Sequence, residues 1–252
     1  QIYLQSTKMI LDYILVIPAR YESSRLPGKP LVDIAGKPMI QRVYEQCQKA
    51  VESNLIYIAT DDDRIRIACE SFGAKVLITS KECLTGTDRV AEVAKKINAR
   101  YYINVQGDEP LFNPRDIKIL IELLNFEKNK ILMGFCPIDT KVDFENRAIP
   151  KIIFSKEKKL LYMSRSPIPG NKKNEFTKAW RQVCAYAFPK DSLDIFSSVK
   201  SKSPIEEIED LEMLRFLEKG ISIKVVEMSS KSIAVDHPED VEKVLKRLED
   251  GT

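Results

Sequence analysis

The chain has 252 residues, a length that suits one large α/β domain or two small ones and that buries a sizeable core without disulfides or structural metals. Its 40 Lys and Arg against 37 Asp and Glu leave a net charge of +3, which excludes the strongly basic footprint of a nucleic-acid-binding protein. Hydrophobic residues at 44% and charged residues at 31% are near globular averages and exclude wholesale disorder, and no apolar run reaches the ~18 residues of a membrane span.

Strands alternate with helices over the first hundred residues. The pattern predicts, in chain order, a strand at 13–17, a loop at 19–38, a helix from 40, a strand at 55–59, a helix opened by 60–63, a strand at 75–78, a helix at 90–97 and a strand at 101–105. The clearest helix carries Val90, Val93, Ala94 and Ile97 on one face. This alternation is typical of an α/β protein with a mostly parallel sheet and helices on both faces.

The middle of the chain is richer in β-type runs, which occur at 131–135, 151–154, 159–163 and 183–188. We expect an antiparallel extension here, a kind of segment that often carries a dimer interface. A helix at 205–217, a strand at 222–226 and a last helix around Val241 and Val244 follow. We therefore expect a single domain at 9–252, and we interpret residues 1–8 as a cloning remnant before a native start at Met9.

The cysteine and histidine content narrows the possible chemistry. The five cysteines are odd in number and form no CxxC pair, and His237 is the sole histidine, which argues against a zinc site. A Ser-His-Asp or Cys-His enzyme would have to use His237, which lies in an acidic, proline-containing context. Unpaired cysteines without a secretory signal predict a cytoplasmic protein.

The loop after the first strand is the strongest candidate site. It contains Arg20, Arg25, Lys29, two serines and Gly28, a combination of cations, hydroxyls and exposed amides that suits a polyphosphate. It is neither a Walker A loop nor a G-x-G-x-x-G dinucleotide fingerprint. On composition alone, a solvated basic surface loop remains the alternative.

Two aspartates follow predicted strands, where ligands gather in open α/β sheets. Asp108 lies in Asn-Val-Gln-Gly-Asp-Glu-Pro and Asp236 in Ala-Val-Asp-His-Pro-Glu-Asp. Carboxylates at strand ends suit Mg²⁺ bound to nucleotide phosphates, because Mg²⁺ takes only one or two protein carboxylates. The alternatives are a turn aspartate beside Gly107 and a helix N-cap, since Asp236 and Glu239 have capping-box spacing.

The segment Thr85-Gly-Thr-Asp-Arg89 leads into a predicted helix. A small glycine loop with hydroxyls at a helix N-terminus can hold a base edge or a phosphate. The alternative is an ordinary helix start. The motif is weak alone, and it gains weight from the basic loop and the two aspartates.

These motifs together resemble those of the 3-deoxy-manno-octulosonate (Kdo) cytidylyltransferases, or CMP-Kdo synthetases. The resemblance covers Asp12 to Leu248 and rests on PARYESSRLPGKPLVDIAGKPMIQRVYEQ, IATDDDRI, TGTDRVAEV, NVQGDEPLF, LYMSRSPIP, IEDLEMLRFLEKG and VDHPEDVEKV, in that order. The first motif and NVQGDEP are highly specific in combination. Sialic-acid CMP synthetases are similar at the start of the first motif, but their first loop differs from SSRLPGKPL.

The resemblance implies a Rossmann-like nucleotidyltransferase fold and a homodimer. It implies Mg²⁺-dependent transfer of CMP from CTP to Kdo with release of pyrophosphate, which activates the sugar for lipopolysaccharide synthesis. The β-rich insertion at about 131–190 would then serve both dimerisation and acceptor binding. In this reaction the protein positions the substrates and neutralises their charge, which needs no catalytic histidine.

By position, the resemblance also assigns site residues. Catalytic roles fall to Arg20, Lys29, Asp108 and Asp236, of which Asp108 and Asp236 would ligate Mg²⁺. CTP would be bound by Pro18, Ala19, Arg20, Ser24, Arg25, Lys29, Thr85, Gly86, Arg89 and Gln106. The sugar acid would face Gln106, Arg165, Gln182, Tyr186, Glu212 and Met213.

The chain departs from the family pattern at three places. Gln182 and Cys184 stand for a His-x-Gly stretch, Glu212-Met213 for a Glu-Gln pair, and Cys83-Leu-Thr85 for a His-x-Ser stretch. Two of the three fall in the expected sugar-acid pocket and none at the expected metal ligands. One alternative is therefore a cytidylyltransferase for a related acid, such as 8-amino-Kdo or a nonulosonic acid. Another is a non-catalytic nucleotide-binding protein, but the presence of the expected cations and aspartates argues against it.

Overall fold

The computed structural model describes residues 10–23, 25–173, 175–230 and 232–251. The interpretation of residues 1–8 and of Met9, and the prediction for Ser24, lie outside these ranges. The strands of the central sheet are β1 (Leu11–Ala19), β4 (Ile56–Thr60), β5 (Lys75–Ile78), β6 (Ala99–Val105), β7 (Ile131–Ile138), β8 (Lys151–Phe154), β9 (Leu160–Ser164), β10 (Ala179–Pro189) and β11 (Ile223–Glu227), and β2 (Asp33–Ile34) pairs with β3 (Lys37–Pro38).

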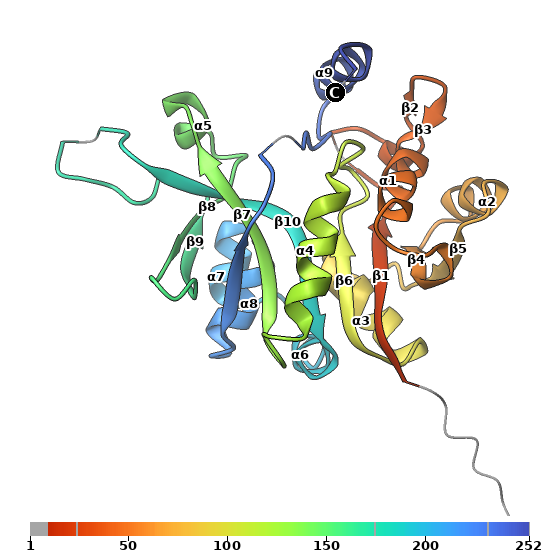
Figure 1. Ribbon diagram of the computed structural model, residues 1–252, viewed down its shortest axis with the longest axis horizontal. Coiled ribbons are helices and arrows are strands. Elements are labelled where there is room, and N and C mark those ends of the chain that lie inside the picture. The colour runs from red at the N-terminus through yellow and green to blue at the C-terminus, as the bar shows by residue number, and fades with distance from the viewer. Residues whose placement is uncertain (1–9, 24, 174, 231, 252) are drawn as a thin grey trace, which may run out of the picture.

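The sheet runs in the order β11-β7-β10-β6-β1-β4-β5 (Figure 1). β1 pairs in parallel with β4 and β6, β4 with β5, and β11 with β7, while β10 is antiparallel to both of its neighbours β6 and β7. The expected mostly parallel α/β sheet is confirmed. Of the β-rich middle segment, only β8 and β9 leave this path, as a hairpin held to β10 through β8.

Helices cover both faces of the sheet. They are α1 (Met39–Gln48), α2 (Asp63–Ser71), α3 (Gly86–Lys96), α4 (Pro114–Leu124), α5 (Lys141–Glu145), α6 (Lys190–Phe196), α7 (Pro204–Glu209), α8 (Met213–Glu218) and α9 (Pro238–Glu249), with short 3-10 turns at Lys29–Leu31 and Ser53–Leu55. Within the described ranges, none of these helices combines the length and hydrophobicity needed to span a bilayer.

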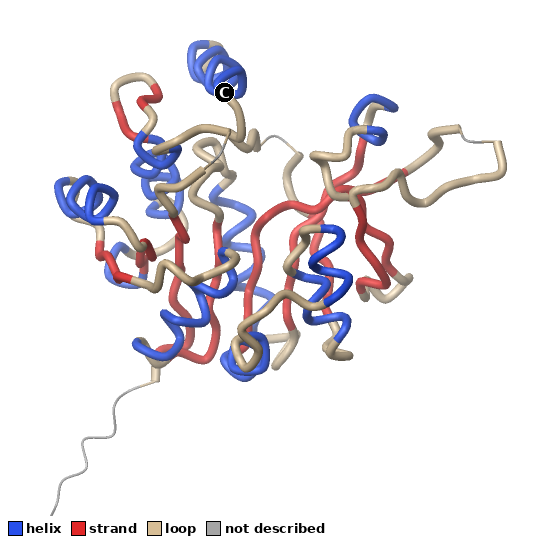
Figure 2. The backbone as a smooth tube through the Cα atoms, turned by 180° about the vertical axis from the view of Figure 1, so that it is seen from behind, coloured by secondary structure: helices blue, strands red, loops and turns tan. Residues whose placement is uncertain are grey.

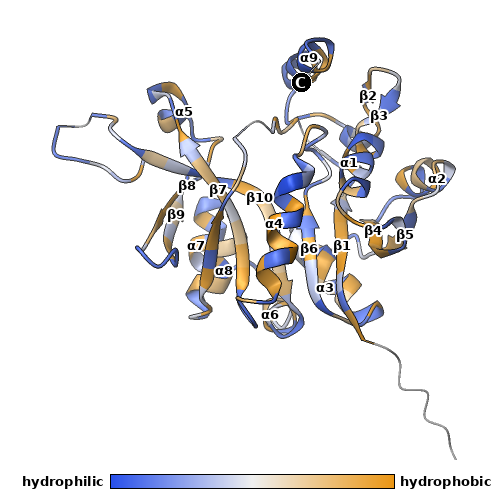
Figure 3. Cartoon of the chain, viewed as in Figure 1, coloured by the Kyte–Doolittle hydropathy of each residue, from blue (hydrophilic) through white to orange (hydrophobic). Residues whose placement is uncertain are grey.

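The alternating faces of β1 explain its uninterrupted apolar run. Leu15 and Ile17 pack with residues of α1, α2 and α4, whereas Ile14 and Val16 pack with α3, α6 and α8 on the opposite face, seen in Figure 2. A parallel strand buried on both faces needs apolar residues at every position. Figure 3 shows β1 hydrophobic along most of its length.

The carboxyl ends of β1 and β6 bring two loops into close contact. A Cβ at Gly107 would lie only 2.8 Å from the Pro18 carbonyl oxygen, so glycine is required for the two loops to approach. The backbone N–H of Val235 donates to the Asp108 carbonyl at 2.9 Å and adds a third segment to this edge. The basic loop, Asp108 and Asp236 therefore meet at one edge of the sheet.

Two predictions about helices were wrong or incomplete. The expected helix at 205–217 is broken into α7 and α8, because Asp210 adopts a left-handed backbone conformation with φ 51°. Pro204 begins α7 within a capping box formed by Ser203 and Glu206. The apolar periodicity continues across the break, which is why the pattern alone predicted one helix. The sequence analysis also missed α4, α5 and α6.

Candidate active site

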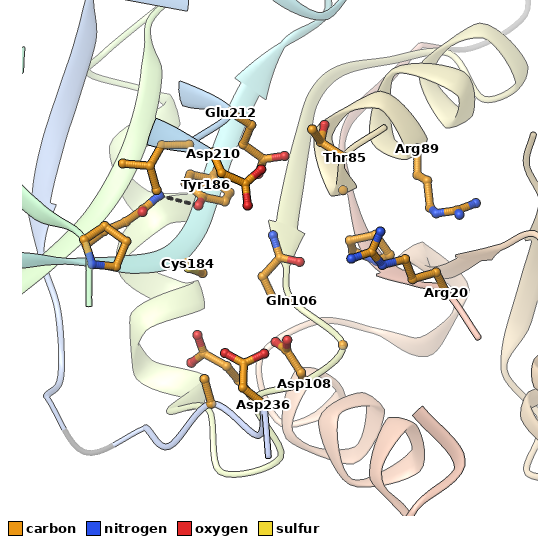
Figure 4. A pocket seen from close by; sticks show the side chains of 18 of the residues that line it. Arg20, Thr85, Arg89, Gln106, Asp108, Cys184, Tyr186, Asp210, Glu212 and Asp236 are labelled. Carbon is orange, nitrogen blue, oxygen red and sulfur yellow. Dashed lines mark hydrogen bonds between the residues drawn. The ribbon is translucent and has the colours of Figure 1, made fainter. Parts of the chain in front are cut away.

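A cavity of about 450 Å³ opens at this edge of the sheet (Figure 4). The predicted site residues that line it are Pro18, Ala19, Arg20, Arg25, Lys29, Thr85, Gly86, Arg89, Gln106, Asp108, Arg165, Gln182, Tyr186, Glu212 and Asp236. Met213 is different: it is fully buried in the core and does not line the cavity. Successive residues of a helix point about 100° apart, so Glu212 and its neighbour Met213 face different surroundings. The structure therefore does not bring Met213 to the cavity with the other residues predicted to face the sugar acid.

Two opposite walls enclose the cavity, with Asp108 and Asp236 beside both (Figure 4). We call the first the α3 wall, and it consists of Pro18, Ala19, Arg20, Thr85, Gly86, Arg89 and Gln106. We call the second the β10 wall, and it consists of Arg165, Arg181, Gln182, Cys184, Tyr186, Lys202, Asp210 and Glu212.

Lys29 bridges the two aspartates. Its Nζ lies 2.6 Å from Asp108 Oδ2 and 3.2 Å from Asp236 Oδ1, and Arg25 Nη2 lies 2.9 Å from the same Asp236 oxygen. Burial acts to lower the pKa of Lys29, but the two carboxylates outweigh it and hold that pKa above its ordinary value. The ammonium therefore stays charged at neutral pH.

Asp236 is not the N-cap of the last helix. His237 occupies that position in α9, and its backbone N–H donates to Asp240 Oδ2 at 3.0 Å. The side chain of Asp236 instead pairs with Arg25 and Lys29. The cap alternative is thus wrong, and the carboxylate of Asp236 faces the cavity.

The donor set suits Mg²⁺. Oxygens of Asp108 and Asp236 both lie within hydrogen-bonding distance of one nitrogen, so they converge on a single cation. Within the described part of the chain, no cluster of three or more His, Cys, Asp or Glu side chains is placed to hold a metal. Two carboxylates are nevertheless sufficient, because Mg²⁺ completes its octahedral shell with water and substrate phosphates.

The α3 wall is built on a helix N-terminus. Thr85 is the N-cap of α3: its backbone N and its Oγ1 both donate to Asp88 Oδ2 at 2.8 Å, and Asp88 N donates back to Thr85 Oγ1 at 3.2 Å. A Cβ at Gly86 would lie 3.3 Å from Gln106 Oε1 and from Pro18 Cγ. The absence of a side chain at Gly86 therefore lets the turn lie against Gln106 at the end of β6.

Arg89 is held from behind the α3 wall. It is 3% exposed, and its guanidinium donates to Thr79 Oγ1 at 2.7 Å, to the Ser80 carbonyl at 3.2 Å and to Asp61 Oδ2 at 2.8 Å. Although Arg89 borders the cavity, most of its hydrogen-bonding capacity is used in joining α3 to the ends of β4 and β5.

The β10 wall depends on a bulge in its strand. The pairing of β10 with β7 shifts register between Val183 and Tyr186, which turns side chains of this stretch toward the cavity. Gln182 Nε2 donates to the Tyr186 hydroxyl at 2.5 Å. Burial, with Cys184 and Glu212 nearby, raises the pKa of Tyr186 well above its ordinary value, and burial also raises the pKa of the Cys184 thiol. Both groups stay neutral at physiological pH.

Arg165 and Glu212 connect the β10 wall to neighbouring elements. Arg165 Nε donates to the Glu209 carbonyl at 2.6 Å and Arg165 Nη2 to the Asp210 carbonyl at 3.1 Å, so the left-handed turn after α7 orients this guanidinium. Glu212 Oε2 accepts from the backbone N–H of Thr87 at 3.1 Å, and burial raises its pKa.

Several cavity residues escaped the sequence analysis. Arg181 directly precedes the stretch of Gln182 and Cys184, Lys202 lies in a segment without a recognisable motif, and Lys202 Nζ pairs with Asp210 Oδ1 at 2.6 Å. Glu109 is nearly buried and accepts from Ser232 Oγ at 2.5 Å, while burial raises its pKa to about 7. The sequence did offer one indication that Glu109 lies at the site, because it directly follows Asp108.

A buried lysine supports the loop that borders the β10 wall. Lys151 is fully buried, and its Nζ donates to the carbonyls of Asn146 and Ile149 at 2.8 and 2.7 Å. Ala148, Ile149 and Pro150 of this loop line the cavity. Burial, reinforced by Arg147 and Arg165, lowers the pKa of Lys151 to about 8.

This lysine predicts a pH-dependent stability. The folded protein releases the Lys151 proton near pH 8 and the unfolded chain only near pH 10.4, so the cost of burying the charge is fully present below pH 8 and is relieved above it. The free energy of unfolding relative to a Lys151→Met variant should rise by about 1–3 kcal/mol between pH 7 and pH 10 in urea titrations. For Lys156→Met, an exposed lysine on the same hairpin, the difference should stay flat. The same pH dependence of stability in both variants would contradict the lowered pKa of Lys151.

Comparisons with known proteins agree with this geometry. The cytidylyltransferase family profile matches residues 14–226. The 3-deoxy-manno-octulosonate cytidylyltransferase of Escherichia coli is 39% identical, covering 92% of this chain and 94% of its own length. The 8-amino-3,8-dideoxy-manno-octulosonate cytidylyltransferase of Shewanella sp. strain W3-18-1 is 40% identical, covering 96% and 100%.

A solved structure of CMP:2-keto-3-deoxy-manno-octonic acid synthetase complexed with CTP superposes with a TM-score of 0.88 at 37% identity, covering 96% of this chain and 100% of that one. The chain therefore belongs to the cytidylyltransferase family of enzymes. Within that family, the resemblance to the CMP-Kdo synthetases indicated by the sequence motifs is confirmed.

Proposed function

We propose that the enzyme transfers CMP from CTP to 3-deoxy-manno-octulosonate and releases pyrophosphate. The observation that carries this proposal is the bridge of Lys29 between Asp108 and Asp236, because it lies where the α3 wall and the β10 wall meet. A cation, two carboxylates and a cavity with two distinct walls provide what a phosphoryl-type transfer between two substrates requires.

In this proposal, the α3 wall receives CTP. The turn at Thr85 and Gly86 and the backbone at Pro18 and Ala19 face the cytosine, while Arg20, Arg25 and Lys29 lie toward the triphosphate. The guanidinium and ammonium groups neutralise the phosphate charge. The Asp108 and Asp236 carboxylates hold Mg²⁺, which when bound offsets phosphate charge and lowers the pKa of the attacking hydroxyl.

The β10 wall receives the sugar acid. Arg165 and Arg181 supply positive charge for the acceptor carboxylate, and Gln106, Gln182 and Tyr186 supply hydrogen bonds for its hydroxyls. The anomeric hydroxyl then attacks the α-phosphorus in line, so that a new C–O–P linkage forms as the bond from that phosphorus to the pyrophosphate oxygen breaks. The hydroxyl proton passes to solvent and pyrophosphate leaves with the displaced electron pair.

A second candidate acceptor is 8-amino-3,8-dideoxy-manno-octulosonate. Asp210 lies on the β10 wall with a side chain that is 70% exposed, so a cationic amino group can share this carboxylate with Lys202, which pairs with it at 2.6 Å. The Shewanella relative named for this substrate is as similar to the chain as the E. coli enzyme named for Kdo.

The deciding experiment measures pyrophosphate release from CTP and Mg²⁺ with three acceptors: Kdo, 8-amino-Kdo and a nonulosonic acid. Fastest turnover, by kcat/KM, with Kdo supports the proposal, and fastest turnover with 8-amino-Kdo supports the second candidate. Release with none of them would indicate a nucleotide-binding protein without this activity. Asp210→Asn, which removes the charge but keeps the shape, should lower turnover of 8-amino-Kdo more than that of Kdo.

Replacing Asp108 with asparagine tests the metal assignment. The amide keeps the shape of the side chain but removes the charge that a hard cation needs, so the Mg²⁺ concentration for half-maximal activity should rise and the maximum should fall. A Mg²⁺ titration of CTP turnover measures both quantities. An unchanged midpoint and maximum would mean that Asp108 is only a turn residue.

We also propose that the enzyme is a cytoplasmic homodimer that supplies activated sugar for lipopolysaccharide synthesis. Exposed apolar side chains on the β9 hairpin and on α7 support a second copy as partner: Leu161 is 58% exposed and Ile208 is 83% exposed. Light scattering should report twice the chain mass, and Ile208→Glu should shift the mass toward that of one chain.

A further inference from the structure

A buried ion-pair network lies behind the α3 wall. Arg215 of α8 is 1% exposed and Glu206 of α7 is fully buried. Their side chains form a two-pronged pair, with Nε 2.6 Å from Oε2 and Nη2 2.7 Å from Oε1. Because the guanidinium is paired on two of its nitrogens, its charge is compensated within the protein interior.

The third nitrogen of Arg215 reaches a different element. Arg215 Nη1 lies 3.1 Å from Oδ1 of Asp88, on the first turn of α3. The other oxygen of Asp88 accepts from the backbone N and the hydroxyl of Thr85. One carboxylate thus joins the buried arginine to the residue that begins the α3 wall.

The N-terminal end of α8 also contacts this turn at Thr87. Glu212, three residues before Arg215, accepts from the backbone N–H of Thr87 at 3.1 Å. The turn from Thr85 to Asp88 is therefore held at two points from one neighbouring helix, by contacts that span 125 and 127 positions of the chain.

Asp88 and Arg215 do not themselves line the cavity, whereas Thr85, Gly86 and Glu212 do. The influence of Asp88 on a ligand therefore passes through the turn that it holds, whereas Arg215 also contacts the cavity lining through Glu206. This placement distinguishes them from the residues that contact substrate directly.

We propose that Arg215, acting through Asp88, is a positioning residue that sets the Thr85–Thr87 turn for selection of the cytosine base. The proposal rests on the proposed function in taking CTP as the nucleotide and the turn at Thr85 and Gly86 as the part of the cavity that faces the cytosine. A hydrogen bond to the edge of a base is sensitive to displacements of a few tenths of an ångström. A loosened turn therefore weakens the binding of cytosine more than the binding of other bases.

Asp88→Asn separates this role from the capping role. The asparagine oxygen can still accept from Thr85, but its amide group then faces Arg215, and the attraction between the two is lost. Arg215 keeps its two-pronged pair with Glu206, so no buried charge is left unpaired. The matched control is Asp143→Asn in α5, where a half-buried aspartate accepts from the Thr140 hydroxyl at 2.9 Å in the same N-cap arrangement, outside the cavity.

The experiment measures Kd for CTP and for UTP by calorimetry in the presence of Mg²⁺, without acceptor. Loss of one charge-assisted hydrogen bond should raise Kd for CTP by about tenfold in Asp88→Asn and change Kd for UTP much less, while Asp143→Asn matches wild type. Arg215→Lys should have the same direction of effect but also disturbs the pair with Glu206, and the losses in the double variant should be less than additive, because both changes weaken the contact between positions 88 and 215.

Unchanged CTP affinity in Asp88→Asn would overturn the proposal. So would equal losses for CTP and UTP, since a merely structural ion pair would weaken both nucleotides together with the melting temperature. Because no acceptor is present, a wrong assignment of the sugar acid leaves this result intact, and failure of the proposed function is seen separately in the acceptor assays.

Discussion

Replacing Lys29 with alanine is expected to lower turnover of CTP by about 100- to 1,000-fold, the usual loss when one preorganised electrostatic contact is removed from a transition state. The ammonium pairs with both Asp108 and Asp236, and its side chain is 16% exposed. Without it, two carboxylates face each other and the incoming triphosphate meets uncompensated negative charge.

Folding should change little in this variant, because Lys29 belongs to a loop and no core packing depends on its ammonium. The measurements are kcat for pyrophosphate release and the melting temperature. Lys37→Ala is the matched control: Lys37 also pairs with a carboxylate, Glu45 at 2.8 Å, but it lies outside the cavity. Near-normal activity of Lys29→Ala would refute a role in triphosphate binding.

Replacing Asp236 with serine is expected to abolish most activity while leaving the melting temperature almost unaltered. A neutral hydroxyl is a poor Mg²⁺ ligand beside a carboxylate. The stability cost is small, since His237 rather than Asp236 begins α9, and the lost contacts with Arg25 and Lys29 are partly exposed ion pairs of the kind worth ~0–1 kcal/mol.

The test measures turnover of CTP at limiting and at saturating Mg²⁺. Glu239→Gln is the control, because Glu239 is an exposed acid three positions further along that does not line the cavity. This variant should behave as wild type at both Mg²⁺ concentrations. Normal turnover of Asp236→Ser at limiting Mg²⁺ would exclude Asp236 as a ligand and leave Asp108 as the remaining candidate.

Much of this protein was predictable from its sequence because the informative signals are local. The apolar run that became β1 and the helical stripe of Val90 to Ile97 each depend on neighbouring residues, and so does the strand that ends before Gly107. The order of such elements predicted the sheet, and the rule that ligands gather at carboxyl ends of strands pointed to Asp108. The family motifs then identified the class of enzyme.

Other features depend on contacts between distant parts of the chain, and only the tertiary structure decided them. Lys29 meets Asp108 across 79 positions and Asp236 across 207, so no local pattern could show that one ammonium bridges both carboxylates. The same applies to Met213, which shares the periodicity of its segment but packs into the core.

The local rules also failed where long-range packing competes with them. Capping-box spacing favoured Asp236 as the start of α9, yet the ion pairs with Arg25 and Lys29 draw its carboxylate into the cavity and leave the cap to His237. The left-handed conformation of Asp210 interrupts a continuous apolar pattern and turns α8 so that Arg215 can reach Asp88. The sequence by itself determined the fold class, the family and half of the residues that line the cavity, because these follow from near neighbours and motifs. Which charges meet inside the cavity was decided by the folded chain, since such pairing depends on distances that only the assembled sheet defines.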